Sequence, residues 1–237
     1  MWLVLKKKHI PWIVILTILL IDQVVKVLVK TNMTLGQSIP VFGDWFLIHF
    51  TENYGMAFGM EFSGDYGKLA LSLFRIIAVL FIGWYIHRLV IKRAATGLIF
   101  CASMIMAGAL GNIIDSAFYG LVFSESQFNQ VASLFPEEGG YGAFLHGKVV
   151  DMLYFPVIKG TFPSWVPFWA DQPFIFFRPV FNVADSAITT GVFILIIFQK
   201  RFFGSQSRRK DAAWQQISVA RNDARSGADD GDEPISS

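Results

Sequence analysis

The 237-residue sequence contains little charge and only one cysteine. That cysteine, Cys101, cannot form a disulfide within the chain, and no Cys/His spacing indicates a zinc site, so we expect neither a metal nor a cofactor. Cys101 lies in an apolar run beside small residues, which favours a packed side chain over a nucleophile. Charged residues make up 16% of the chain, whereas a soluble domain has about 25%.

The net charge is also low, at +2, and no basic cluster with interleaved aromatic residues suggests a nucleic-acid surface. We therefore expect no nucleic-acid partner. The chain is instead rich in hydrophobic residues, which make up 54% of it and gather in long runs. This distribution is typical of an integral membrane protein.

Four segments are long and apolar enough to cross a bilayer, at residues 10–29, 69–91, 96–114 and 181–198. Each has about the 20 residues that a hydrocarbon layer requires. Backbone groups in lipid must be satisfied within the segment, which predicts helices. The first segment is of spanning length and no small-residue cleavage site follows it, so we do not interpret it as a removed signal peptide.

Basic residues flank these segments on one side of the predicted membrane. They are Lys6, Lys7, Lys8, Lys92, Arg93, Lys200, Arg201, Arg208, Arg209 and Lys210. The positive-inside rule then places both termini in the cytoplasm and the two long loops, 31–68 and 116–180, outside. Residues 1–203 are expected to form one transmembrane domain. The polar tail, 204–237, is expected to be a disordered cytoplasmic segment, in which 212–219 is best suited to a short surface helix.

The two outer loops differ in pattern. Loop 31–68 has alternating and aromatic stretches that predict short strands. Loop 116–180 is rich in Phe, Trp, Pro and Gly and is too apolar for a solvated linker. We expect parts of the second loop to rest at the membrane interface.

Polar residues gather near the predicted outer ends of the apolar segments and in the outer loops. They are Asp22, Gln23, Lys26, Glu52, Asn53, Asn112, Asp115, Asp151, Asn182 and Asp185. A charge at membrane depth costs roughly 2.5 to 3.5 kcal/mol on insertion scales, so such residues face protein or water and usually serve a function. Chance would have scattered some of them toward the cytoplasmic side, so the layer indicates one site.

Structural roles explain several of these residues equally well. Asp22 and Lys26 are one helical turn apart and could form a plain ion pair. Asn112 and Asp115 are three apart on one helix face, after a run of small residues, and could serve helix packing. Asn53 suits a turn.

Asp151 and Asp185 are harder to explain in this way. Each follows apolar residues, and neither has a basic neighbour in the sequence within the membrane. Two carboxylates in a partly dry site cannot both ionise easily, so one keeps its proton. The ionised carboxylate can take a proton from water while the protonated one donates to a carbonyl oxygen, which is the chemistry of peptide hydrolysis without a metal.

Five motifs follow one another along the chain: DQVVK at 22–26, ENYGMAFG at 52–59, GNIID at 111–115, HGKVVDM at 146–152 and FNVADSAI at 181–188. Together they resemble the lipoprotein signal peptidase family, also called signal peptidase II. The resemblance covers all four apolar segments in order and leaves out residues 1–8 and 204–237. The family comprises aspartyl endopeptidases of the bacterial inner membrane that remove the signal peptide of a prolipoprotein, cutting before a cysteine that carries diacylglycerol.

The resemblance implies that Asp151 and Asp185 form the catalytic dyad. It implies that the residues which support the site or bind substrate are Asp22, Lys26, Asn53, Gly55, Ala57, Phe58, Asn112, Asp115 and Asn182. The implied fold is an all-α integral membrane protein, a four-transmembrane-helix bundle with a small extracytoplasmic β-cradle and its active site near the outer face. The implied partners are diacylglyceryl-modified prolipoproteins and membrane lipids, and we expect a monomer.

One departure from the family pattern lies in the third apolar segment. Ser116 follows Asp115, where the family usually has arginine. Either the role of that arginine is absent here or another basic residue takes it over. The candidates are Arg75, Lys148 and Arg178.

A second departure is the length of the outer loop around Asp151. Segments 117–143 and 156–180 look like insertions relative to the shorter connections of the family. Three roles stay open for them: an interfacial helix, a gate at the lipid entrance, and a binding surface for an accessory partner.

Two other classes of function compete with a peptidase. A transporter or channel that uses membrane carboxylates would show repeats and broken helices near the midplane, and the sequence shows neither. A non-enzymatic scaffold for membrane proteins would tolerate Asp151→Asn, whereas a peptidase would not.

Overall fold

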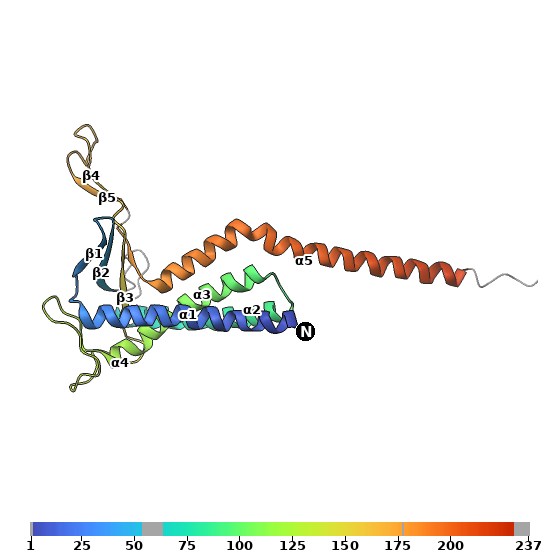
Figure 1. Ribbon diagram of the computed structural model, residues 1–237, viewed down its shortest axis with the longest axis horizontal. Helices are drawn as coiled ribbons and strands as arrows, with labels where there is room; N and C mark the ends of the chain where they lie inside the picture. The colour runs from blue at the N-terminus through green and yellow to red at the C-terminus, as the bar shows by residue number, and fades with distance from the viewer. Residues whose placement is uncertain (1, 54–63, 177, 230–237) are drawn as a thin grey trace, which may run out of the picture.

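Four long helices and two small sheets make up the protein in the computed structural model, which describes residues 2–53, 64–176 and 178–229 (Figure 1). The helices are α1 (Trp2–Asn32), α2 (Gly64–Ile91), α3 (Thr96–Ile114) and α5 (Val183–Asp229). Within the described residues, four stretches have the length and composition to cross a membrane: Lys7–Asn32, Ser72–Ile91, Thr96–Val122 and Val183–Phe202. Helices are therefore present at all four places where the sequence predicts them.

Helix α3 packs against α1, α2 and α5. Glycines allow the closest of these contacts. A Cβ atom at Gly108 would lie 2.2 Å from the backbone oxygen of Ala184 on α5, and one at Gly111 would lie 2.7 Å from Oδ2 of Asp22 on α1. Small residues near the end of α3 thus bring three helices together at the level where the polar side chains gather.

The third span is longer than predicted. Beyond Ile114 it continues through a π-helical turn, Asp115–Tyr119, and a last turn, α4 (Gly120–Val122). The outer loop therefore begins after Val122 and not at residue 116, because the residues of this stretch are mostly apolar and continue the span. Isolated π turns are frequent at functional sites, and this one begins at Asp115.

An antiparallel sheet covers one end of the bundle (Figure 1). Its strand order is β1 (Ser38–Phe42), β2 (Phe46–Asn53), β3 (Val149–Tyr154), β6 (Val180–Phe181). Residues Phe50, Val150 and Met152 are fully buried and pack against the end of α1. The strands predicted in loop 31–68 are present as β1 and β2. The description all-α was too narrow, because the loop that precedes α5 contributes strands as well.

A separate hairpin, β4 (Ile158–Thr161) and β5 (Pro173–Phe176), occupies most of the insertion 156–180. It lies beyond the first sheet and extends sideways from the direction of α1 (Figure 1). Neither strand was predicted, because aromatic and proline residues interrupt any regular alternation in this segment.

Helix α5 runs on through the tail to Asp229, so the structure corrects the expectation of disorder for residues 204–229. In Figure 1 this extension leads away from the bundle, at the end opposite the sheet. The tail contains many Ala, Gln, Arg and Lys residues, which are good helix formers. Because the span already supplies the first turns, these residues extend the helix without the cost of a new nucleus.

Candidate active site

Asp22, Lys26 and Asp115 form a buried ion network where α1 meets the end of α3. Lys26 Nζ lies 2.9 Å from Asp22 Oδ2 and 2.8 Å from Asp115 Oδ2, and it donates a hydrogen bond to Asn112 Oδ1 at 3.0 Å. All three charged side chains are fully buried. Removing a charge from water costs several kcal/mol, so such a group persists only when its members satisfy one another. The ion pair considered for Asp22 and Lys26 is present, with Asp115 as a third member.

The same network holds the two elements that carry the predicted dyad. Asp22 Oδ1 accepts a hydrogen bond from the N–H of Ala184 at 2.9 Å, in the first turn of α5. A carboxylate is favourable at this end of a helix. Asp115 Oδ2 accepts a hydrogen bond from the N–H of Val150 at 3.2 Å, one residue before the aspartate of β3. The ion network therefore positions both α5 and β3.

Asp151 on β3 and Asp185 in the first turn of α5 are linked through two amide side chains. Asn182 Nδ2 donates to Asp151 Oδ1 at 2.7 Å and to Asn112 Oδ1 at 3.1 Å. Asn112 Nδ2 donates to Asp185 Oδ1 at 2.8 Å. Asn182 also caps α5, since its Oδ1 accepts the N–H of Asp185 at 2.8 Å. We refer to the two asparagines as the amide bridge.

The two aspartates differ in their exposure to solvent. Asp151 is 4% exposed, whereas Asp185 is half-buried. Burial raises the pKa of the Asp151 carboxyl to about 7, and the charge of Asp185 acts in the same direction. The hydrogen bond from Asn182 and the charge of Lys26 oppose this rise. A carboxyl with such a pKa changes its protonation state near neutral pH, as general acid–base catalysis requires.

An arginine from another helix lies beside Ser116. Arg75 Nη1 of α2 is 3.4 Å from Ser116 Oγ, and the carboxylates of Asp185, Asp115 and Asp151 attract its positive charge. The structure thus places a guanidinium next to the residue at which this chain departs from the family motif. Of the other two basic residues considered, Lys148 pairs with glutamates and Arg178 is exposed.

A second buried charge cluster lies one turn further along α1. Lys30 donates to Ser126 Oγ at 2.7 Å and forms an ion pair with Glu52 of β2. Lys148 Nζ lies 3.7 Å from the other oxygen of Glu52 and 3.0 Å from Glu125 Oε1. The cluster joins α1, β2 and the loop before β3. The sequence analysis gave Lys30 no role. Its spacing of four from the preceding lysine of α1 places both lysines on one helix face, which was a signal that could have been used.

Gln23 and Tyr119 also belong to the site and were not predicted as site residues. Gln23 Nε2 donates to Asp115 Oδ1 at 2.9 Å, and Tyr119 Oη donates to Gln23 Oε1 at 3.2 Å. Gln23 could have been found from its place in the predicted polar layer. Nothing in the sequence indicated Tyr119, because its contact depends on the π turn at the end of α3.

The remaining predicted site residues belong to the end of β2 and the segment after it. Asn53 is the last residue of β2 and pairs with Val149, so it lies on the strand next to that of Asp151. The structure brings Asn53 to the neighbourhood of the site through this register. Gly55, Ala57 and Phe58 lie outside the described residues.

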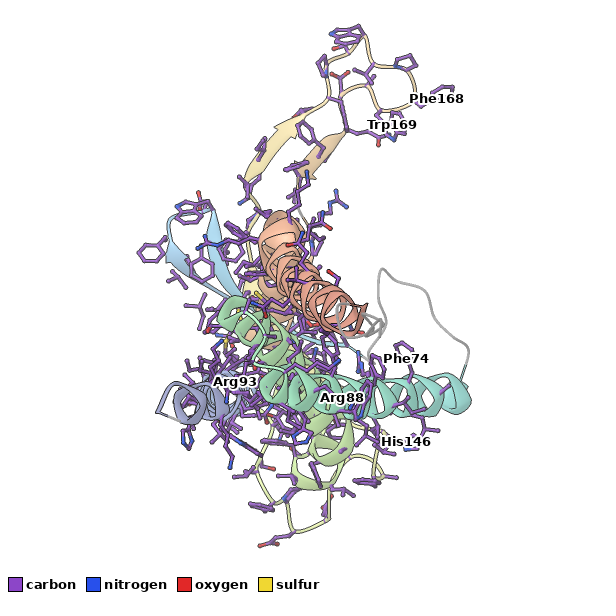
Figure 2. All side chains as sticks on the ribbon, turned by 90° about the vertical axis from the view of Figure 1, so that its right-hand side faces the viewer. Phe74, Arg88, Arg93, His146, Phe168 and Trp169 are labelled. Carbon is purple, nitrogen blue, oxygen red and sulfur yellow. The ribbon has the colours of Figure 1, made fainter. Side chains whose placement is uncertain are left out.

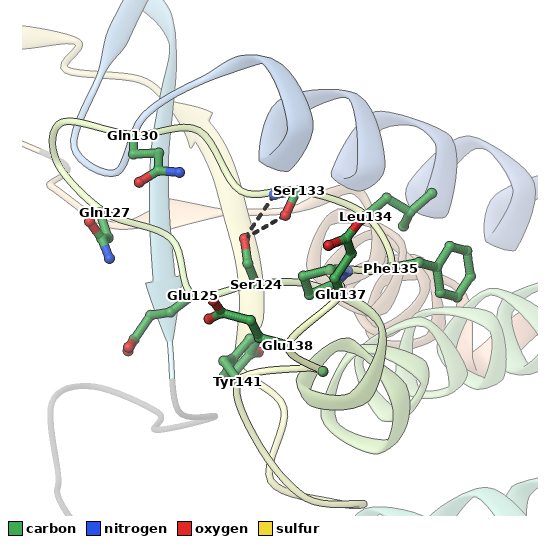
Figure 3. Close-up of a pocket in the computed structure, with 12 residues that line it drawn as sticks. Ser124, Glu125, Gln127, Gln130, Ser133, Leu134, Phe135, Glu137, Glu138 and Tyr141 are labelled. Carbon is green, nitrogen blue, oxygen red and sulfur yellow. Dashed lines mark hydrogen bonds between the residues drawn. The ribbon is translucent and has the colours of Figure 1, made fainter.

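A hollow of about 710 Å³ opens in the insertion 117–143 (Figure 3). Its lining includes Glu125, Glu137 and Glu138, and also Ser133, whose N–H and hydroxyl donate to Ser124 Oγ at 2.8 and 3.1 Å. None of the residues of the ion network or the amide bridge lines it. Across residues 2–53, 64–176 and 178–229, no three His, Cys, Asp or Glu side chains are placed to hold a metal ion.

The sequence matches the family model described as signal peptidase (SPase) II over residues 14–201. It is similar to the lipoprotein signal peptidase of Porphyromonas gingivalis, with 53% identity over 188 residues that cover 79% of this chain and 81% of that protein. The lipoprotein signal peptidase of Amoebophilus asiaticus is 41% identical, over 76% of this chain and 73% of its own. That of Pelodictyon phaeoclathratiforme is 31% identical, over 82% of this chain and 92% of its own.

A solved structure of a bacterial membrane enzyme has a similar fold, with a TM-score of 0.52 and 24% sequence identity. The alignment covers 81% of this chain and 87% of that one. At this identity the likeness concerns the fold alone. The segment matched by the family model contains the ion network, the amide bridge and both aspartates.

Proposed function

The chain belongs to the signal peptidase II family, and from this premise we propose that it is an intramembrane aspartyl endopeptidase with Asp151 and Asp185 as its catalytic dyad. Family membership indicates a protease that removes the signal peptide from prolipoproteins. The proposed substrates already carry diacylglycerol, and the chain is cut just before the lipidated cysteine. These finer points are what the resemblance to the family implies.

The amide bridge is the observation that carries the proposal. Each carboxylate accepts a hydrogen bond from one asparagine, and the two asparagines bond to each other. Two acidic groups held in one partly dry place share a proton, and the pair titrates as a unit. Since the pKa of Asp151 is raised to about 7, this carboxyl still carries a proton in a large fraction of the molecules near neutral pH.

The proposed reaction uses one water molecule. The oxygen of the water attacks the scissile carbonyl carbon while Asp185 takes a proton from that water. At the same time Asp151 gives its proton to the carbonyl oxygen. In the resulting tetrahedral intermediate the carbon bears two hydroxyl groups. Asp185 then protonates the nitrogen, the carbon–nitrogen bond breaks, and Asp151 regains a proton as the new carboxylic acid forms. The half-buried position of Asp185 leaves it accessible to water.

The other polar residues support this pair. Asn112 and Asn182 orient the two carboxylates, and Lys26 with its two carboxylate partners anchors the helix and the strand that carry them. Asn53 lies on β2, the strand that pairs with the strand of Asp151. Precise orientation of reacting groups accounts for several kcal/mol of a barrier in favourable cases.

We further propose that the dyad faces the outer side of the bacterial inner membrane, with both termini in the cytoplasm. The charge distribution supports this. Arg88 and Arg93 lie at the end of the bundle that faces the viewer in Figure 2, and the sheet with Asp151 lies at the other end (Figure 1). Basic residues mark the cytoplasmic side of a membrane protein. There the dyad meets lipidated precursors and surrounding lipids, and we propose that the enzyme works as a monomer.

A gel-shift assay with a diacylglyceryl-modified prolipoprotein, in detergent or lipid, tests the proposal. We expect the parent protein to release the signal peptide, and Asp151→Asn and Asp185→Asn to release none. Asp44→Asn is the matched control, because Asp44 is an exposed aspartate in the turn between β1 and β2. It should cleave at the parent rate. Thermal unfolding of each purified variant establishes that the loss is not due to misfolding.

Robust cleavage by either dyad variant would refute the mechanism. A chelator adds a second readout, since a dyad that works without a metal predicts unchanged turnover in its presence. Loss of turnover on chelation, restored by a divalent cation, would replace the proposed chemistry with a metal-dependent one.

A further inference from the structure

The hairpin of β4 and β5 reaches out past the helices of the bundle. In Figure 1 it lies at the sheet end of the molecule and runs across the direction of α1. In Figure 2, which looks toward that end from the other side of the bundle, the hairpin extends well beyond the helices, with Phe168 and Trp169 near its tip. If four helices cross a bilayer, an arm at this position lies over lipid and not over protein.

The arm, which we define as residues 157–176, is aromatic and almost uncharged. Six of its twenty residues are Phe or Trp, and its charged residues are Lys159 and Asp171, which cancel. Its large side chains face outward: Phe168 is 91% exposed and Trp165 is 80% exposed. Several rings of this kind on one projection form a contiguous apolar surface, which soluble proteins rarely expose without a partner.

Part of the backbone of the arm is paired within the hairpin. Strands β4 and β5 pair from Ile158 with Phe176 to Thr161 with Pro173. At the tip, the N–H of Phe162 donates to the oxygen of Gln172 at 3.0 Å, and the N–H of Asp171 donates to the oxygen of Phe162 at 3.1 Å. A two-stranded hairpin leaves the outward N–H and C=O groups of both strands to bond water or lipid headgroups, so the arm suits the polar–apolar interface and not the hydrocarbon core.

The apolar surface of the arm continues along the sheet. Phe42 and Trp45, in and beside the turn between β1 and β2, are more than half exposed and stack with ring centroids 6.1 Å apart. The ring centroid of Trp45 lies 6.3 Å from that of Phe155, two residues before the arm. Aromatic rings thus extend from the β1–β2 turn to Phe155, and the exposed Val157 and Ile158 continue the apolar surface into the hairpin, at the level where membrane proteins carry their aromatic belts.

We propose that the arm docks on the bilayer surface, with Trp165, Phe168 and Trp169 inserted between lipid headgroups and acyl chains. Trp in particular favours this interface, where its ring is apolar and its N–H stays wet. The arm carries no net charge, so the partner it fits is a bilayer surface in general, including a zwitterionic one. Such a contact restrains the sheet that carries Asp151 relative to the membrane. This inference needs only that the four helices span, and it is independent of the proposed peptidase chemistry.

Site-directed spin labelling tests the docking in the full-length protein, reconstituted into phosphatidylcholine bilayers. A label is attached at Phe168→Cys, and in a second variant at Trp165→Cys. The native Cys101 is fully buried, and the unsubstituted protein serves as the labelling blank. The matched control is Glu137→Cys, an exposed position in the other insertion. The measured quantity is the ratio of collision rates with oxygen, which enriches in lipid, and with a water-soluble nickel complex.

We expect this ratio to be several-fold higher at 165 and 168 than at 137. High salt and added anionic lipid should leave it unchanged, because the arm is uncharged overall. Equal ratios at all three positions would show an arm in water and overturn the proposal. A raised ratio that appears only with anionic lipid would indicate electrostatic docking and would also overturn the proposal. A raised ratio that appears only after a prolipoprotein is added would indicate a substrate-binding surface and would overturn it as well. Since cleavage is not the readout, failure here leaves the dyad proposal intact.

Discussion

The hydrogen bond from Asn182 to Asp151 predicts how the pH dependence of cleavage responds to one substitution. Asn182→Ser keeps a side chain able to cap α5, because serine is a good N-cap residue. It removes the amide N–H that lies 2.7 Å from Asp151 Oδ1. The substitution therefore separates the capping role of Asn182 from its contact with the dyad.

The size of the effect follows from that contact. Asn182 stabilises the charged form of Asp151, so its loss raises a pKa that already stands at about 7. A hydrogen bond to a charged group contributes about 1.5 to 3 kcal/mol, and one pKa unit corresponds to about 1.4 kcal/mol. The upper limb of the pH–rate profile should therefore move upward by roughly one to two units. Solvent screening reduces this little, since Asp151 is nearly fully buried.

The measurement is kcat/KM for a lipidated peptide as a function of pH, in detergent. The sign is fixed by the proposed mechanism: activity falls as the dyad loses its last proton, and that loss shifts to higher pH in the variant. Ser186→Ala is the control, because Ser186 Oγ donates to the backbone oxygen of Asn182 at 2.9 Å in the same turn and does not bond the dyad. An upper limb that stays in place, or moves downward, in Asn182→Ser would show that Asp151 is not the group that titrates there.

Three further substitutions test the surroundings of the dyad. Lys26→Met leaves two buried carboxylates without their cation. We therefore expect the free energy of unfolding, measured by denaturant titration, to fall by about 3 to 5 kcal/mol. A fall below about 1 kcal/mol would show that Lys26 is not the buried partner of both carboxylates. Arg75→Gln removes a charge attracted by the dyad and should move the upper pH limb upward, whereas Arg88→Gln, which removes a guanidinium stacked on Trp84, should not. Gly108→Val places a side chain against the backbone of α5 and should lower the thermal midpoint, and an unchanged midpoint would show that α3 and α5 are further apart.

Much of the helical framework was accessible from the sequence, because it depends on composition over some twenty residues at a time. The four spans follow from the length of the apolar runs, and the contact of Asp22 with Lys26 follows from the helical period. The end of the third span was placed too early. The prediction ended this span once it had the roughly 20 residues that a bilayer requires. Length alone does not reveal the π turn through which the helix continues.

The sequence named many residues of the candidate site but not the contacts between them, and it missed Gln23, Lys30 and Tyr119. Motif resemblance selected Asp151, Asp185 and the residues of the ion network. It did not show that Asn182 both caps α5 and bonds Asp151, or that Lys30 and Glu52 form a second buried pair. These contacts depend on helix packing and strand register, and neither leaves a periodic signal in a single sequence.

The sequence by itself determined that the chain crosses a membrane and that acidic and amide side chains collect at one level of it, because hydrocarbon tolerates few charges and helices have a fixed rise. Only the tertiary structure decided which of these groups touch. Asn112 meets Asp185, 73 positions away, and Arg75 meets Ser116, 41 positions away, since Gly108 and Gly111 let helices approach closely and the sheet lays β3 across their ends. Local composition determines which segments span the membrane, whereas these contacts arise from packing between segments that are distant in the sequence.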